Sequence, residues 1–210
     1  MCYMIQGSIK NKLMHVKSLG TVPIKHTIPS RHDSRNKEIV GRVVKQLELD
    51  KYNVQYSRES LKRCLYPSKD ILVPIDADRK VEVRNKVLIG QGRHLLNLQW
   101  NIAMLRLFKR TPDNLNGFDF NYSEKSSILA ELKQRDITRL YVQYLRDHDL
   151  NGIARIEIPA DRVSSRLQKR QDLQAFLGIM GYISLLNSEP TLINFINRSI
   201  IIKIINPLIS

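Results

Sequence analysis

The stretch from residue 86 to residue 108, K-V-L-I-G-Q-G-R-H-L-L-N-L-Q-W-N-I-A-M-L-R-L-F, constrains the fold of this 210-residue chain more than any other. Its first apolar run, residues 87–89, is short and continuous, which predicts a strand buried on both faces. Gly90 ends this run. From His94 onward, apolar residues recur at intervals of three and four, which predicts a helix that continues to the end of the stretch. The stretch therefore predicts a strand, a glycine turn and a helix in succession.

The predicted glycine turn is a candidate phosphate site. Gly90 and Gly92 flank Gln91 and permit backbone angles that other residues resist, so that main-chain amides can converge on one point. These amides would lie at the N-terminus of the following helix, and Arg93 adds a forked cationic donor. We expect Gly90, Gly92, Arg93 and His94 to bind a phosphate group. The alternative is a turn that only reverses the chain, because G-x-G-R-H is neither a P-loop nor the full dinucleotide fingerprint.

The residues of this turn resemble the nucleotide-binding box of ParB-type partition proteins and sulfiredoxins, in which an apolar strand ends in a Gly-rich turn with basic residues before a helix. These families write the box as G-E-R-R or G-C-H-R. Gly90 and Arg93 match it, whereas Gln91 and Gly92 replace the acidic residue and the first arginine of the partition box. Over residues 20–108, the resemblance implies a ParB-like nucleotide-binding fold that contacts phosphate or nucleic acid. The sulfiredoxin cysteine is absent, which excludes peroxiredoxin repair.

Positive charge is concentrated in the first half of the chain. The formal net charge is +14, and residues 1–110 hold 22 Lys and Arg against 9 Asp and Glu, whereas residues 111–210 hold 12 against 11. Such a field attracts polyanions, because each neutralised phosphate releases condensed counterions. We therefore expect a nucleic-acid partner, DNA rather than RNA. The alternative is a protein that is merely basic.

A membrane partner is not expected. The sequence contains neither an apolar stretch of the ~20 residues that a span requires nor a basic amphipathic helix with bulky aromatic residues. Cys2 and Cys64 are the only cysteines, so that no disulfide framework is expected and the cytoplasm or another reducing compartment fits best. The sequence leaves open whether the chain forms homo-oligomers.

Several cations of the first half belong to segments that are expected to be exposed. Residues 29–37, P-S-R-H-D-S-R-N-K, are polar and rich in turn formers, which predicts a basic loop. Amphipathic helices, predicted over residues 38–49 and after Ser57 as N-cap, turn further cations toward solvent. The expected phosphate contacts are Arg31, Arg35, Lys37, Lys62, Arg63, Arg84 and Arg93.

Three carboxylates lie on or beside a predicted hairpin of two strands, residues 70–75 and 80–84. They are Asp70, Asp76 and Glu82. Their pattern resembles the core of metal-dependent nucleases of the PD-(D/E)xK type, in which two carboxylates hold Mg²⁺ and a lysine two residues beyond the second positions water. Arg84 stands where that lysine belongs. The alternative is an ordinary hairpin whose carboxylates face water or pair with lysines.

The favoured function is therefore non-catalytic nucleic-acid binding through a basic face and the glycine turn. The alternatives are a metal-dependent nuclease that uses Asp70 or Asp76 with Glu82, a nucleotide hydrolase, and a structural component of a ribonucleoprotein or viral particle. The sequence identifies no cofactor, and the two candidates are a nucleotide at the glycine turn and Mg²⁺ at the carboxylates. No metal site is expected at the five histidines, which lack a close ligand spacing.

We expect an α/β or α+β fold with a small mixed sheet. Residues 1–110 would form a basic nucleic-acid-binding region that combines this sheet with amphipathic helices. Residues 111–210 would form a mainly helical region with one or two strands, either separate or part of the same compact domain.

Within the second half, a helix is predicted over residues 136–149 and another from Asp161. The latter helix carries a local basic ridge, formed by Arg162, Arg166, Lys169 and Arg170. Alternation of apolar and polar residues predicts a half-buried strand over residues 153–158, and the apolar stretch 199–209 predicts a terminal strand.

Overall fold

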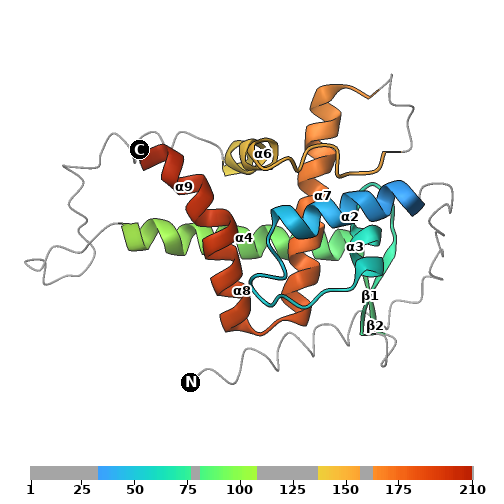
Figure 1. Ribbon diagram of the computed structural model, residues 1–210, viewed down its shortest axis with the longest axis horizontal. Helices are drawn as coiled ribbons and strands as arrows, with labels where there is room; N and C mark the ends of the chain where they lie inside the picture. Colours follow the sequence, from blue (N-terminus) through green and yellow to red (C-terminus); the bar gives the residue numbers. More distant parts are fainter. Residues whose placement is uncertain (1–32, 77–80, 108–136, 157–162, 210) are drawn as a thin grey trace, which may run out of the picture.

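The computed structural model describes residues 33–76, 81–107, 137–156 and 163–209 (Figure 1). Within these ranges the fold is α+β, mostly helical with a two-stranded sheet, which confirms the expected fold class; the sheet is antiparallel rather than mixed. In chain order, the elements are α2 (Asp33–Gln46), α3 (Arg58–Cys64), β1 (Leu72–Asp76), β2 (Val81–Arg84), α4 (Asn85–Leu107), α6 (Ile137–Asp147), α7 (Ser165–Leu186), α8 (Glu189–Ile196), η4 (Asn197–Ile201) and α9 (Ile202–Ile209). None of the helices in these ranges combines the length and the apolar character that crossing a membrane requires.

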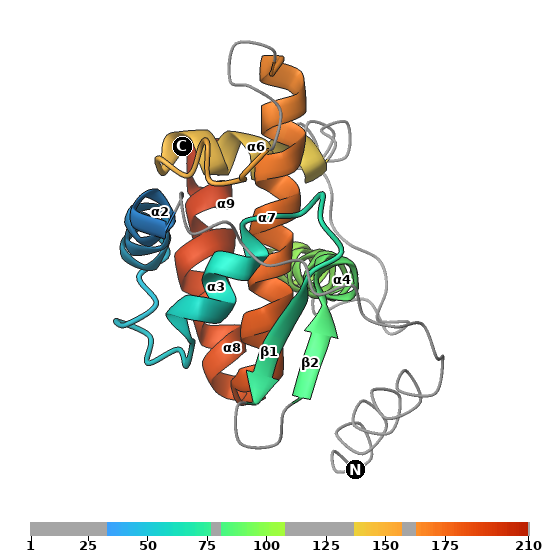
Figure 2. The ribbon, with the colours of Figure 1, turned by 90° about the vertical axis from the view of Figure 1, so that its right-hand side faces the viewer.

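Helices α4 and α7 cross at the centre of the molecule and make its most extensive contact (Figures 1 and 2). Helix α4 comes from the first half of the sequence and α7 from the second. Leu88 and Leu96 of α4 are fully buried, as are Phe176 and Ile179 of α7, and all four belong to one hydrophobic cluster. Both halves of the sequence therefore contribute to a single core.

Glycines let these two helices touch backbone to backbone. A Cβ atom at Gly92 would overlap the carbonyl oxygen of Leu177, and a Cβ atom at Gly181 would overlap that of Leu88. Only hydrogen atoms fit at these two positions, because the facing groups are main-chain atoms that cannot move aside. The close crossing of α4 and α7 therefore requires glycine on both helices.

Helix α4 replaces the predicted strand, turn and helix with one continuous helix. The predicted strand over residues 87–89 is wrong: Leu88 is fully buried, whereas Val87 is 43% exposed, and the buried positions continue at helical spacing to Leu96 and Trp100. The run of apolar residues before Gly90 gave the misleading signal. A glycine inside a helix costs only about 1 kcal/mol relative to alanine, and the packing of α4 on α7 offsets that cost.

Helices α2 and α3 confirm the two amphipathic helices predicted for the first half. Helix α2 buries Ile39, Val40 and Val43 on one face. It begins at Asp33, so that the predicted loop is wrong for residues 33–37, and residues 29–32 lie outside the described part of the chain. The residue before α3 is Ser57, as predicted, although its side chain makes no capping hydrogen bond.

Strands β1 and β2 confirm the predicted hairpin. They pair in antiparallel register with Val73 opposite Val83, and both of these side chains are buried. Glu82 and Arg84 flank Val83 on the strand and are exposed, as the alternation of a half-buried strand requires. The residues between the strands, 77–80, lie outside the described part.

The C-terminal stretch is helical, so the predicted strand over residues 199–209 is wrong (Figure 1). Helix α8 continues through the π-helical segment η4 into α9. Ile200, Ile201, Ile204 and Ile205 are buried, whereas Ile202 is 44% exposed, which is a helical pattern and not an alternating one. The near-continuous isoleucine run hid this pattern in the sequence.

Residues 153–156 do not form a strand, so that part of the strand predicted over residues 153–158 is wrong, and residues 157–158 lie outside the described part. Ile153 and Ala154 are adjacent in sequence and both buried, which an alternating strand does not allow. Helix α7 is capped by Ser164, whose hydroxyl accepts a hydrogen bond from the Leu167 amide at 3.2 Å.

Candidate nucleic-acid interface

The glycine turn that was expected to bind phosphate does not exist in the fold. Gly90, Gly92, Arg93 and His94 all lie inside α4, beyond its first four residues, where each amide donates to a carbonyl of the preceding helical turn. These amides therefore cannot converge on a phosphate, and the prediction of a phosphate-binding turn is wrong. The strand and turn on which the ParB-like resemblance depends are absent from residues 85–107.

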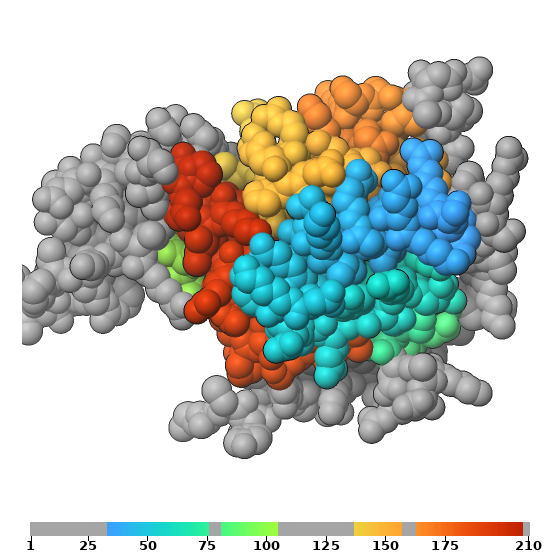
Figure 3. Space-filling model, viewed as in Figure 1, coloured from blue at the N-terminus to red at the C-terminus, as the bar shows by residue number. Residues whose placement is uncertain are grey.

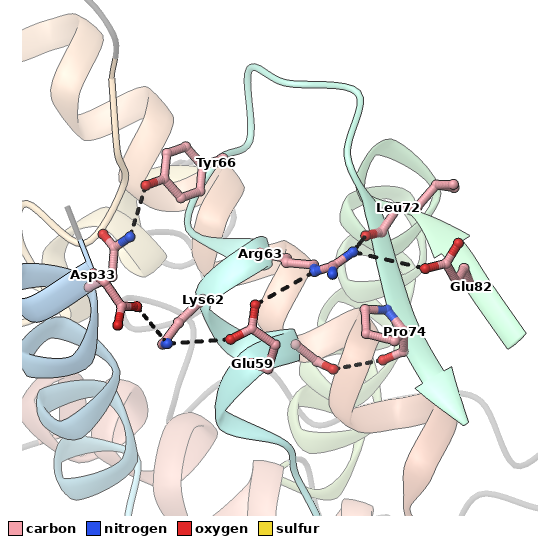
Figure 4. Close-up of polar contacts among 10 residues, drawn as sticks. Asp33, Glu59, Lys62, Arg63, Tyr66, Leu72, Pro74 and Glu82 are labelled. Atoms are coloured by element: carbon pink, nitrogen blue, oxygen red, sulfur yellow. Dashed lines mark hydrogen bonds and ion pairs between the residues drawn. The ribbon is translucent and has the colours of Figure 1, made fainter. Parts of the chain in front are cut away.

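Lys62, an expected phosphate contact, is instead bound to neighbouring acids (Figure 4). Its Nζ lies 2.7 Å from Oδ1 of Asp33 on α2 and 3.3 Å from Oε2 of Glu59, and its side chain is only 13% exposed. Lys37 pairs with the same aspartate at 2.9 Å. Hydrogen bonds from Lys62 and Lys37 lower the pKa of Asp33, and the bond to Asp33 raises the pKa of Lys62. This cluster ties α2 to α3.

Arg63 connects α3 to the hairpin in the same way (Figure 4). Its Nη1 donates to the carbonyl of Leu72 at 2.8 Å and lies 3.9 Å from Oε1 of Glu82. Beside it, the Ser60 hydroxyl donates to the carbonyl of Pro74 at 2.7 Å. The guanidinium of Arg63 is therefore largely committed to holding the sheet against α3.

The remaining expected phosphate contacts are scattered over several elements. Arg35 is exposed on α2 beside a small hollow of about 130 Å³ that Glu38 and Arg42 also line. Arg93 is exposed on α4. Arg31 lies outside the described residues.

Two of the three carboxylates considered for a nuclease are paired with cations. Oδ2 of Asp70 lies 3.8 Å from Nη1 of Arg84, and Glu82 is the partner of Arg63 already described. Asp76 ends β1, with its backbone opposite Val81. Within the described residues, no three His, Cys, Asp or Glu side chains lie where they could hold a metal ion together. The nuclease hypothesis gains no support from these contacts.

A hollow in the second half of the chain is lined by several cations. Helix α6 and the first turns of α7, which adjoin at the top of the space-filling view (Figure 3), line a groove of about 600 Å³. Five cationic side chains line it: Arg139, Arg146, Arg166, Lys169 and Arg170. All five are exposed, and the described residues that line the groove include no carboxylate. We call this the α6/α7 groove.

The amphipathic pattern of α6 explains why its arginines reach the groove. Leu140, Tyr141, Tyr144 and Leu145 are buried, and the Tyr144 hydroxyl donates to the carbonyl of Ser199 at 2.9 Å. This fixes the rotation of α6 about its axis. Arg139 and Arg146, seven residues apart, then lie on the opposite face one above the other.

Four of the five groove cations, on α6 and α7, make no ion pair with the described residues: Arg139, Arg166, Lys169 and Arg170. Arg146 is partly engaged, since its Nη2 donates to Oε1 of Gln143 at 2.6 Å and its Nε lies 3.7 Å from Oδ1 of Asp147. Within the part of the chain that the structure describes, no carboxylate neutralises these four cations, in contrast to Lys62 and Arg63.

Asp172 holds the turn that forms one wall of the groove, at Asn151. Its Oδ2 accepts the Gly152 amide at 2.9 Å, and its Oδ1 accepts the Ala154 amide and Nε2 of Gln168, both at 2.8 Å. The Asp172 carboxylate is buried, and burial raises its pKa while these three donors oppose the rise. The turn is thereby fixed to α7.

The sequence indicated half of this groove. The basic ridge predicted on the helix from Asp161 contains Arg166, Lys169 and Arg170; Asp161 and Arg162 lie outside the described residues. The contribution of α6 was missed, although the seven-residue spacing of Arg139 and Arg146 on an amphipathic helix was a usable signal. The near-zero net charge of the second half hid the groove, because a sum over the sequence does not show where the cations gather.

Comparisons of the sequence with models of known protein families and with curated proteins find no match.

Proposed function

We propose that this protein binds nucleic acid and that the α6/α7 groove contacts the phosphates. The observation that carries the proposal is the set of five exposed cations around a concave surface whose described lining contains no carboxylate. Concave surfaces lined by one sign of charge focus the electrostatic field and concentrate ligands of opposite charge. A polyanion gains most from such a surface, since each neutralised phosphate releases counterions.

The arrangement of the cations fits a chain of phosphates better than a single small anion. They come from two helices, with Arg139 and Arg146 two turns apart on α6 and Arg166 and Arg170 one turn apart on α7. Each guanidinium can bind a phosphate through two parallel hydrogen bonds. Of the two polymers, we retain DNA from the sequence analysis, and the experiment below compares both.

The test is a gel-shift series with duplex DNA, single-stranded DNA and RNA at two or more ionic strengths. Replacing Arg139, Arg166 and Arg170 together with alanine should weaken binding and lower the slope of log affinity against log salt by about two to three, one unit per lost phosphate contact. An unchanged slope in this variant would contradict the proposal.

A matched control removes the same amount of charge elsewhere. Lys45, Lys86 and Arg198 are exposed on α2, α4 and η4, away from the groove lining. Their joint replacement with alanine lowers the net charge equally, so that it reports the long-range field alone. A salt slope that falls as far in this control as in the groove variant would show that the groove is not the binding surface.

A further inference from the structure

We propose that the strand bound in the α6/α7 groove is single-stranded, with at least one base resting against Val142 and Leu173 while its phosphates contact the surrounding cations. This inference rests on the proposed function and specifies its ligand. It depends on a property of the groove that phosphate binding alone leaves unexplained: the groove also contains apolar side chains.

Val142 of α6 and Leu173 of α7 both line the groove and are half-buried, whereas the five cations are exposed. Leu173 packs against the hydrophobic core from outside. The apolar groups thus lie deeper than the charged ones, so that the groove has an apolar bottom and a cationic rim. A ligand that offered phosphates alone would leave the apolar bottom in contact with water.

The rim favours a ligand that has flat faces as well as phosphates. Four of its five cations are arginines and one is Lys169. A guanidinium group is planar, stacks on flat rings and is weakly hydrated, whereas an ammonium group acts as a point charge. Arginines therefore suit contacts in which a base stacks near a bound phosphate.

The size of the groove favours a single strand over a duplex as its ligand. A volume of about 600 Å³ falls within the range of sites that enclose small organic molecules, which includes nucleosides. In a duplex the bases are stacked and paired inside, so that their faces cannot reach Val142 and Leu173. In a single strand the bases can turn outward and enter a pocket. The exposed side chain of Asn151 on the groove wall adds an amide that can hydrogen-bond a base edge.

The test compares three ligands on the unaltered full-length protein at one salt concentration: a single-stranded DNA of twelve nucleotides, an abasic strand of equal length and charge, and the duplex of the same sequence. The normal single strand should bind at least about fivefold more tightly than the other two, as expected when one base is buried against the protein. Because the protein is not changed, no folding defect can affect this comparison.

A protein variant locates the effect. Val142→Asn should remove most of the preference for the normal strand over the abasic strand, whereas Val87→Asn, at another partly exposed valine on α4, should leave it intact. Equal affinity for normal and abasic strands would overturn this inference while leaving the proposed function standing. Failure of all nucleic acids to bind at low salt would overturn both proposals.

Discussion

Gly92 of α4 lies so close to Leu177 of α7 that a side chain at position 92 would overlap the Leu177 carbonyl oxygen, and Gly181 faces Leu88 with the same restriction. The two positions place one glycine on each helix, so the close approach is reciprocal. In the sequence, Gly90 and Gly92 suggest a phosphate-binding turn. In the structure, Gly92 instead allows the long helices α4 and α7 to cross in contact.

Alanine at position 92 should therefore destabilise the protein. The added methyl group must push α4 away from α7, and overpacking of this kind costs about 3 kcal/mol. Gly90 provides a matched control two residues earlier in the same helix, because a Cβ atom there would meet no neighbouring atom within 4 Å. Gly90→Ala should be neutral or stabilising by about 0.5–1 kcal/mol, as for a glycine inside a helix. Urea unfolding of the two variants checks both values, and equal stabilities would contradict the crossing described here.

The ion pairs of Asp33 should make stability depend on pH in the acidic range. Hydrogen bonds from Lys62 and Lys37 lower the pKa of Asp33 below its usual value of 3.8, so that folding favours the ionised carboxylate. The resulting stabilisation is complete above the pKa of the unfolded state and is lost as the pH falls through the lower pKa of the folded state. Asp33→Asn should flatten the acid limb of the stability profile in thermal unfolding measured between pH 2 and pH 5.

The two lysines that pair with Asp33 provide a comparison for the measurement of stability against pH. The hydrogen bond from Lys62 is the largest cause of the lowered pKa of Asp33, and Lys62 is the less exposed of the two lysines. Lys62→Met should therefore flatten the acid limb more than Lys37→Met. The opposite order would show that the exposed pair with Lys37 holds the carboxylate.

The expected phosphate contact Lys62 should matter for stability and not for nucleic-acid affinity. Its ammonium group is engaged by Asp33 and Glu59, and a methionine keeps the apolar stem while removing that charge. Lys62→Met should cost about 1 kcal/mol in urea unfolding and change nucleic-acid affinity less than twofold. If Lys62→Met lost as much affinity as a single groove variant such as Arg166→Ala, the nucleic-acid interface would lie in the first half of the chain.

Removal of the Asp172 carboxylate should loosen the turn at Asn151 and Gly152. Asp172→Ala leaves two backbone amides and the Gln168 amide without their acceptor, which should cost about 2 kcal/mol. The exposed Asp147 on α6 is the control, and its replacement with alanine should change stability by less than about 0.5 kcal/mol. Hydrogen exchange of the Gly152 and Ala154 amides reports the turn directly, and unchanged protection in Asp172→Ala would refute this role.

The spacing of apolar residues in the sequence correctly predicted those helices and strands whose buried residues recur with one clear period. The helices predicted over residues 38–49 and 136–149 lie at residues 33–46 and 137–147 in the structure. These helices and the hairpin of β1 and β2 each bury one face, and periodicity showed that face. The errors occurred where apolar residues are nearly continuous, at residues 87–89 and 199–209. There the tertiary contacts of α4 with α7 and of η4 and α9 with the core select helix, and a run of apolar residues carries no period that could reveal this.

The candidate groove was harder to predict because it is assembled from residues distant in sequence. The ridge of Arg166, Lys169 and Arg170 lies on one helix and could be identified from its spacing. Its apposition to Arg139 depends on how α6 rests against the core, which the hydrogen bond from Tyr144 to the C-terminal helix helps to determine. Conversely, Lys62 pairs with Asp33, which lies 29 positions away in the sequence. The sequence therefore did not show that an acid neutralises Lys62, one of the expected phosphate contacts.

The π-helical segment η4 lets the C-terminal helix accommodate one residue more than an unbroken α-helix would. A π-turn holds one residue more than an α-helical turn over the same span. Because the wide turn absorbs the extra residue, Ile204 and Ile205 beyond it keep the phase in which they are buried. Deletion of a single residue within η4, for example Arg198, should therefore restore an ordinary α-helical turn and leave both isoleucines buried, whereas deletion of Lys203 from α9 should rotate everything beyond it by about 100°. Natural variants of this chain should accordingly tolerate the loss of one codon in η4 better than the loss of one in α9.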